Sequence, residues 1–189
     1  MIEDIFHIKS ETDFQQKCLE TFRYQYQNIE VYRKFCDYLK INTNEIDEVE
    51  KIPFLPIETF KNHLVLDKVF DFAQTDKPVN FFQSSGTTQI QTRSKHFIAD
   101  FSLYEESIYK SFEQFIGKPE DFIFIGLLPN YSENPHSSLI YMVDFLMKKS
   151  GKPENGYFLY NHKELLELLN KLNDKKVILF GVSFALLDF

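Results

Sequence analysis

Apolar residues in the first forty positions of the chain recur at helical spacing. Phe14, Cys18 and Phe22 are four residues apart, and a similar series follows after residue 30. Positions four residues apart lie on one face of an α-helix, so the pattern predicts two amphipathic helices with a break near Asn28. Thr12, which has a glutamine three positions later, is the predicted N-cap of the first helix.

The pattern changes after residue 41. A polar run from Asn42 to Glu50 predicts a loop. Pro53 and Pro56 each disfavour helical backbone at the residue before them, so this segment is expected to be extended. A short helix around residues 59–60 is predicted to follow.

The rest of the chain mixes strand-like and helical segments. Strands are predicted at 64–66, 79–83, 94–98, 122–128, 157–160 and 177–180. Asp100 is the predicted N-cap of a helix that ends at Gly117. Further helices are predicted at 137–149 and 163–172. Alternation of strand and helix in the second half predicts parallel pairing with helices on the sheet faces, which is the α/β fold class.

The pattern suggests two parts. We expect an N-terminal helical segment over residues 1–50 and an α/β body over residues 51–189, with a mixed or mostly parallel sheet. After Gly181 the sequence resembles the first turns of another helix, and it stops at Phe189 without a cap or a polar tail. We therefore expect the body to be truncated at its C-terminal end.

Charge and composition limit the classes of molecule that the chain is expected to bind. The 189 residues carry 28 acidic and 21 basic side chains, for a formal net charge of -7, which argues against nucleic acid as a partner. From the sequence we expect neither a signal peptide nor a membrane-spanning segment. Cys18 and Cys36 lie among apolar residues of the helical pattern, so both are expected in the core of a cytoplasmic protein. An anionic small ligand such as ATP would need local donors and cations.

One segment offers such donors. Residues 84–88 read Ser-Ser-Gly-Thr-Thr, follow a predicted strand and precede two cations. Four hydroxyls and several backbone N–H groups around a glycine form a candidate phosphate cradle. The same composition is also typical of an ordinary hairpin loop. It has neither the Gly-Lys-Ser/Thr ending of a Walker loop nor the glycine spacing of a dinucleotide site. The candidate residues are Ser84, Ser85, Gly86, Thr87, Thr88, Arg93 and Lys95.

These motifs resemble those of a known family. The string at 84–88 is similar to the phosphate-binding signature of the adenylate-forming superfamily. More narrowly, four segments occur in the same order as in the acyl-protein synthetase family, typified by the fatty-acid-activating component of the bacterial bioluminescence reductase. They are IPFLPI at 52–57, SSGTT at 84–88, and the segments within 128–139 and 179–187.

The resemblance implies a two-step reaction. A carboxylate, expected to be a fatty acid, attacks the α-phosphate of ATP to give an acyl-adenylate and pyrophosphate, and the acyl group then passes to a thiol or an acyl-accepting protein. The four hydroxyl residues of 84–88 would hold the β- and γ-phosphates, with Gly86 giving backbone access. Catalysis would then be mainly charge stabilisation by preorganised donors and Mg²⁺.

The chain departs from the family pattern at two places. The family continues Gly-x-Pro-Lys after the second threonine, whereas this chain has Gln-Ile-Gln-Thr at 89–92, so Arg93 or Lys95 is expected to supply the cation. The family's adenine-binding segment, ribose-binding Asp, catalytic Lys and acyl-accepting Cys have no counterpart before Phe189. Cys18 and Cys36 lie in the wrong region to replace that cysteine. We expect the 189-residue chain alone to lack adenylation activity.

Three further hypotheses stay open at this level. His136 precedes a predicted helix at the carboxyl edge of the sheet, so it either lines the substrate pocket or helps to cap that helix. Gly181–Ala185 resembles a nucleophile elbow, which would make Ser183 the nucleophile of an acyltransferase or hydrolase with His136 or His162 as base. The elbow enzymes place an acid and then a histidine after the serine, and only Asp188 follows here. A non-catalytic binding domain of the same fold is the remaining alternative.

Overall fold

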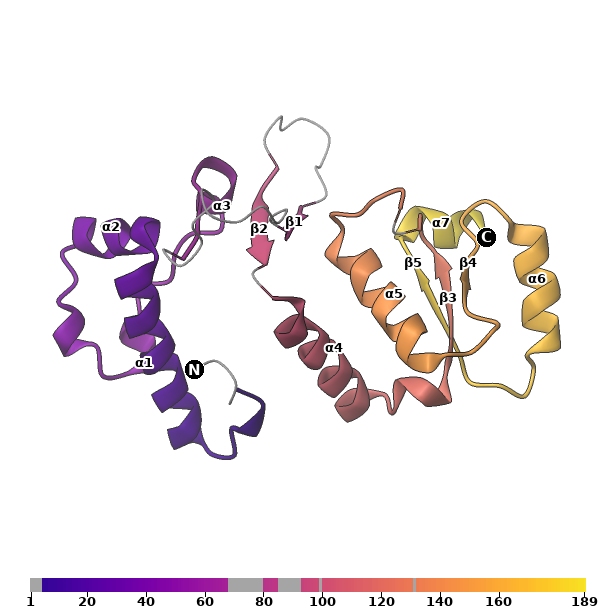
Figure 1. The fold of residues 1–189 in the computed structure, drawn as a ribbon, viewed down its shortest axis with the longest axis horizontal. Helices are drawn as coiled ribbons and strands as arrows, with labels where there is room; N and C mark the ends of the chain where they lie inside the picture. Colours follow the sequence, from indigo (N-terminus) through magenta and orange to yellow (C-terminus); the bar gives the residue numbers. More distant parts are fainter. Residues whose placement is uncertain (1–4, 68–79, 85–92, 99, 131) are drawn as a thin grey trace. The chain divides into compact units, whose positions relative to one another are not determined.

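The computed structural model describes residues 5–67, 80–84, 93–98, 100–130 and 132–189. The chain divides into two compact units, Met1–Ala99 and Asp100–Phe189 (Figure 1). The boundary predicted near residue 50 separates a helical segment from the α/β body, and it does not coincide with the division after Ala99. The two domains predicted from the sequence stay a prediction. Helices and strands occur together in the chain, which confirms the α/β class.

A short 3-10 turn, Ile5–His7, precedes the two helices of the first unit, α1 (Glu11–Asn28) and α2 (Glu30–Tyr38). Ile29 between them has extended backbone, which confirms the predicted break. The predicted N-cap at Thr12 is wrong: Thr12 already lies inside α1, and the Ser10 side chain accepts a hydrogen bond from the Asp13 N–H. Ser10 supplies the short side-chain oxygen that the free N–H groups of a first turn need, two residues earlier than expected.

The core of this unit joins the helices to the segment that follows them. Phe22 of α1 and Tyr32 of α2 meet edge to face with ring centroids 6.2 Å apart. The Tyr32 hydroxyl donates a hydrogen bond of 2.8 Å to the Pro53 carbonyl. Residues 42–50, predicted as a loop, contain one short 3-10 turn, Thr43–Glu45, and a second, Val49–Lys51, begins at their end. Ile46 between these turns is buried in the core.

Both cysteines pack in this unit. Cys36 is fully buried and Cys18 is partly buried against the same cluster of apolar side chains. Neither thiol forms a disulfide. The prediction of a core position is confirmed for Cys36, whereas Cys18 packs at the edge of the core.

A short helix and a hairpin complete the described part of the first unit. Helix α3 (Thr59–Asn62) confirms the predicted short helix, and strands β1 (Asn80–Gln83) and β2 (Lys95–Ile98) pair in antiparallel fashion. The predicted strand at 64–66 is wrong, because these residues find no neighbouring strand in the described part of the unit. Only the next residue, Asp67, forms an isolated bridge, and its partner is Ile29.

The second unit is built on a parallel sheet. Strand β3 (Ile123–Leu127) lies between β4 (Gly156–Tyr157) and β5 (Val177–Gly181), and both neighbours run parallel to it. Every residue of β3 is buried, as expected for a parallel strand covered on both faces. The parallel pairing predicted from the strand–helix alternation is confirmed, although β4 is shorter than the predicted 157–160.

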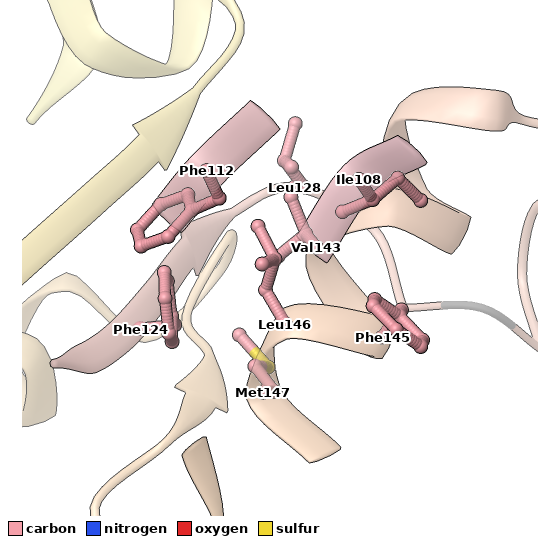
Figure 2. Close-up of a cluster of buried hydrophobic side chains, with 8 residues drawn as sticks. All are labelled: Ile108, Phe112, Phe124, Leu128, Val143, Phe145, Leu146 and Met147. Atoms are coloured by element: carbon pink, nitrogen blue, oxygen red, sulfur yellow. The ribbon is translucent and has the colours of Figure 1, made fainter. Parts of the chain in front are cut away.

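Helices cover the two faces of this sheet. Helices α4 (Phe101–Phe115) and α5 (Ser138–Ser150) pack on one face, in a cluster that Figure 2 shows. Its buried residues are Ile108, Phe112, Phe124, Leu128, Val143, Phe145, Leu146 and Met147. Helices α6 (His162–Lys171) and α7 (Ser183–Asp188) supply side chains to the cluster on the other face. None of the described helices combines the length and the apolar character needed to cross a membrane.

The predicted caps at the two ends of α4 are confirmed. The Asp100 side chain accepts a hydrogen bond from the Ser102 N–H at the start of α4. Gly117, with a φ of 134°, follows the last turn of that helix and donates its N–H to the Phe112 carbonyl. A positive φ is a conformation that glycine adopts without steric cost.

Candidate functional site

The candidate phosphate segment is carried by the β1–β2 hairpin of the first unit. Asn80 pairs with Ile98 at one end of the ladder, and Gln83 pairs with Lys95 at the other. Pairing continues one step further, since the Ser84 N–H donates to the Ser94 carbonyl at 3.1 Å. The Ser94 N–H in turn donates to the Ser84 hydroxyl oxygen at 3.2 Å. The two serines therefore close the hairpin at the base of the connection.

This arrangement gives Ser84 a structural role. Its hydroxyl oxygen accepts a hydrogen bond from the Ser94 N–H. A serine hydroxyl also has one O–H donor, which this hydrogen bond does not use. Ser94, which the sequence did not single out, is only 5% exposed and holds the other side of the closure. The sequence offered little indication of this role of Ser94, because a serine at the start of a strand is common in any hairpin.

The central part of the predicted cradle cannot be placed. Ser85, Gly86, Thr87 and Thr88 lie outside the described residues, together with 89–92. Their role in phosphate binding stays a prediction. The described residues fix where this segment leaves and rejoins the hairpin, at Ser84 and Arg93.

The structure distinguishes the two candidate cations. The Lys95 ammonium lies 5.0 Å from the centroid of the Phe81 ring, within the range of a cation–π contact. Arg93 is exposed and directly precedes Ser94 at the hairpin base. A cation already held on an aromatic face must leave it to reach a new anion. Which of the two would meet a phosphate stays a prediction.

The opposite face of the hairpin is anchored to α3. The His96 ring stacks on the Phe60 ring with centroids 4.7 Å apart. Phe60 follows the proline-rich segment at 52–57, so the stacking links two segments that the sequence identified separately. Neither ring was predicted to matter. Their long separation along the chain left no local pattern from which to infer the contact.

His136 lies in the second unit, in the connection between β3 and α5. It is exposed and precedes Ser137, whose hydroxyl accepts a hydrogen bond from the Ile140 N–H. Ser137 therefore supplies the N-cap of α5. Leu127 pairs with Gly181 at the end of the parallel ladder, so the connection that carries His136 leaves from the carboxyl edge of the sheet. The role of His136 in a substrate pocket stays a prediction.

The features of a nucleophile elbow are not found at Ser183. This serine is the first residue of α7, preceded by Val182 with extended backbone. Of the described residues other than glycine, only Lys40 has a positive φ, so Ser183 does not sit on a strained turn. The proposed base His162 has its Nε2 atom 3.2 Å from the Leu159 carbonyl oxygen.

Close packing explains why position 181 is a glycine. A Cβ atom at this position would lie 2.6 Å from the Cγ atom of Leu186. Real Cβ atoms do not approach other carbons this closely, so the glycine lets α7 pack against the end of β5. The glycine that suggested an elbow is thus explained by helix–strand contact.

Comparison with known proteins identifies part of the chain. Residues 7–100, about half of the chain, match the family model described as "Acyl-protein synthetase, LuxE". The matched region contains the segments at 52–57 and 84–88, whereas the segments within 128–139 and 179–187 lie outside it. No curated protein and no solved structure matches the chain.

Proposed function

Because residues 7–100 belong to the acyl-protein synthetase family, we propose that this chain is part of an ATP-dependent ligase that activates a carboxylic acid. The reaction would join the carboxylate to the α-phosphate of ATP, with release of pyrophosphate. The acyl group would then pass from the acyl-adenylate to a thiol or an acyl-accepting protein. A fatty acid is the proposed substrate.

One observation carries this proposal. The hydroxyl-rich segment 84–88 leaves a hairpin whose base is closed by Ser84 and Ser94, and the exposed Arg93 stands at the same end. A connection of this kind would bring hydroxyl and backbone donors close to a cation, which would suit the oxygens of a triphosphate. The hairpin lies wholly within the matched region.

The described residues suggest how ATP would be held. Arg93 would pair with phosphate oxygens, and the Ser84 O–H would donate to the same group while its oxygen stays bonded to the Ser94 N–H. No cluster of three His, Cys, Asp or Glu side chains suited to a metal ion occurs among the described residues. In this proposal Mg²⁺ would arrive with the triphosphate and keep several of its water ligands. Bound there, it would offset the charge of the phosphates.

Calorimetry on the 189-residue chain tests the proposal. We expect ATP with Mg²⁺ to bind more tightly than AMP with Mg²⁺, because the β- and γ-phosphates supply most of the contacts. Replacing Arg93 by Ala should weaken ATP binding about tenfold, the loss expected for one charge-assisted contact. Lys34→Ala is the matched control, since Lys34 is an exposed cation of the same unit paired with Glu30.

Two results would contradict the proposal. The first is equal affinity for ATP and AMP, which would favour a non-catalytic domain that keeps only the fold. The second is unchanged ATP affinity after both Arg93→Ala and the combined change Gly86→Val with Thr87→Ala.

A further inference from the structure

The side chain of Asn155, the residue before β4, links a helix of the second unit to its sheet. Its Oδ1 atom accepts a hydrogen bond of 2.8 Å from the Phe124 N–H. Its Nδ2 atom donates to the Met147 carbonyl at 2.9 Å and to the Ser150 hydroxyl oxygen at 3.2 Å. Asn155 thus joins the end of α5 to β3 and supplies the acceptor for a backbone N–H of the sheet.

The groups that face the Asn155 Nδ2 atom are both acceptors. The Ser150 O–H donates a hydrogen bond of 2.6 Å to the Phe122 carbonyl, and Ser150 is 8% exposed. A serine hydroxyl has one proton, so Ser150 can only accept from Asn155. The Met147 carbonyl can only accept as well. The network therefore requires a donor at this position, which an amide has and a carboxylate lacks.

The residue that follows Asn155 is a glycine, and its surroundings are tight. A Cβ atom at Gly156 would lie 3.0 Å from the Cε2 atom of Phe158, closer than carbon atoms normally approach. The fold therefore favours an amide at 155 and a glycine at 156 for two separate reasons. Together they form the one Asn-Gly pair in the sequence.

An Asn-Gly pair is chemically reactive, and asparagine is among the thermolabile residues of proteins. The glycine nitrogen can attack the Cγ atom of the asparagine, because no Cβ atom shields it. A bond forms between that nitrogen and Cγ, the Cγ–Nδ2 bond breaks, and the amide leaves as ammonia with the proton of the glycine N–H. Water then opens the succinimide at either of its two C–N bonds and gives aspartate or isoaspartate. No oxidant or reductant is needed.

We propose that Asn155 is a modification site controlled by folding: the folded second unit suppresses its deamidation, and opening of the unit permits it. In the folded chain three hydrogen bonds hold the Asn155 amide, and Gly156 is paired with Ile125 of β3. The Gly156 nitrogen is thereby kept from turning towards Cγ. When the unit opens, these contacts are lost and the glycine gains its full conformational freedom.

The products of the reaction do not rebuild the network. Aspartate at 155 places a second acceptor against the Met147 carbonyl and the Ser150 oxygen. Isoaspartate inserts a methylene group into the backbone directly before β4, in which only Gly156 and Tyr157 pair with β3. Either product destabilises the folded unit, so deamidation makes a reversible opening irreversible. The modification requires neither ATP nor the proposed acyl activation.

Mass spectrometry of the full chain tests the control by folding. The chain is kept at mildly alkaline pH with and without urea and then digested, and the replacement of NH₂ by OH at 155 is measured as a mass gain. We expect this reaction to be at least about tenfold slower in the folded chain. Asn28, followed by the β-branched Ile29, is the internal reference and should react far more slowly than Asn155 in urea. Equal rates at Asn155 in the two conditions would overturn the proposal.

A pair of variants tests the consequence for stability. Asn155→Asp should lower the equilibrium constant of folding about tenfold, since a partly buried donor is replaced by an unmatched acceptor. Asn173→Asp, the same change at an exposed position of the same unit, should alter it by no more than about twofold. Urea denaturation followed by circular dichroism measures both. Failure of Asn155→Asp to fold would agree with the proposal, and equal stability of the two variants would overturn it.

Refolding of the unmodified sequence supplies a test that needs no variant. Chains are kept in urea for increasing times, returned to buffer, and separated into refolded and non-refolded fractions. We expect isoaspartate at 155 to accumulate in the non-refolded fraction. Equal isoaspartate content in the two fractions would overturn the link between this modification and the loss of the fold.

Discussion

The ring of His96 on strand β2 stacks on the ring of Phe60 in α3, with centroids 4.7 Å apart and an angle of 26° between the ring planes. The hairpin that carries the candidate phosphate segment is thereby fastened to the end of the proline-rich segment. An aromatic pair of this kind contributes about 0.5–1.5 kcal/mol beyond the area that it buries.

The first prediction concerns this pair. Phe60→Ala and His96→Ala should each lower the free energy of unfolding, and the double variant should lose less than the sum of the two. We expect an interaction energy of about 1 kcal/mol from urea denaturation. Phe60→Tyr, which keeps the ring, is the control. Fully additive losses would show that the stacking contributes nothing to stability.

The second prediction concerns the closure of the hairpin. Ser84→Ala removes the oxygen that accepts the Ser94 N–H, so the free energy of unfolding should fall by about 1 kcal/mol. Ser84→Thr keeps a hydroxyl and should lose less. Hydrogen exchange at the Ser94 amide measures the effect directly: exchange should become faster in the alanine variant. An unchanged exchange rate would contradict the role assigned to Ser84.

The third prediction concerns the contact between β5 and α7. Gly181→Ala places a methyl group 2.6 Å from Leu186, and the variant should lose about 1–3 kcal/mol of stability through overpacking. Leu186→Ala in the same chain should recover part of that loss. Thermal denaturation of the single and double variants measures both changes. Failure of the second substitution to recover any stability would rule out this steric explanation.

The fourth prediction concerns a buried hydroxyl. The Tyr157 hydroxyl oxygen is buried and has no hydrogen-bond partner among the described residues. Burial, assisted by the negative charge of Asp144, raises its pKa to about 12. Tyr157→Phe should therefore be neutral or stabilising by up to about 1 kcal/mol at pH 7, because no hydrogen bond is lost. Urea denaturation of both proteins is the measurement.

The same substitution predicts a difference in pH dependence. The pKa of Tyr157 is higher in the folded chain than the ordinary value of about 10 in the unfolded chain. The unfolded state therefore releases this proton first, so the contribution of Tyr157 is intact below pH 10 and is lost as the pH rises towards 12. The stability of Tyr157→Phe should fall less steeply over that window. If the free energies of unfolding of the two proteins changed in parallel between pH 10 and 12, the raised pKa of Tyr157 would be contradicted.

Sequence patterns predicted the local structure well where the cause is local. The break near Asn28 and the Asp100 cap follow from helix periodicity and from the side-chain oxygen that a first turn needs. The parallel sheet followed from the alternation of strand and helix. Thr12 was misassigned because Ser10 offers the same chemistry two residues earlier. The prediction of a strand at 64–66 was wrong because a strand needs a neighbouring strand for its backbone hydrogen bonds. The local residue pattern does not show whether such a neighbour is present.

For the candidate site, the sequence determined which residue types are present, and the fold decided which of them meet. The amino-acid sequence is enough to identify the hydroxyl residues of 84–88 and the two nearby cations. It is also enough for the match to a family. The tertiary structure decided that Lys95 lies on Phe81 and that Ser84 closes the hairpin. These contacts join residues from different elements, and packing of the whole unit sets the distance between them.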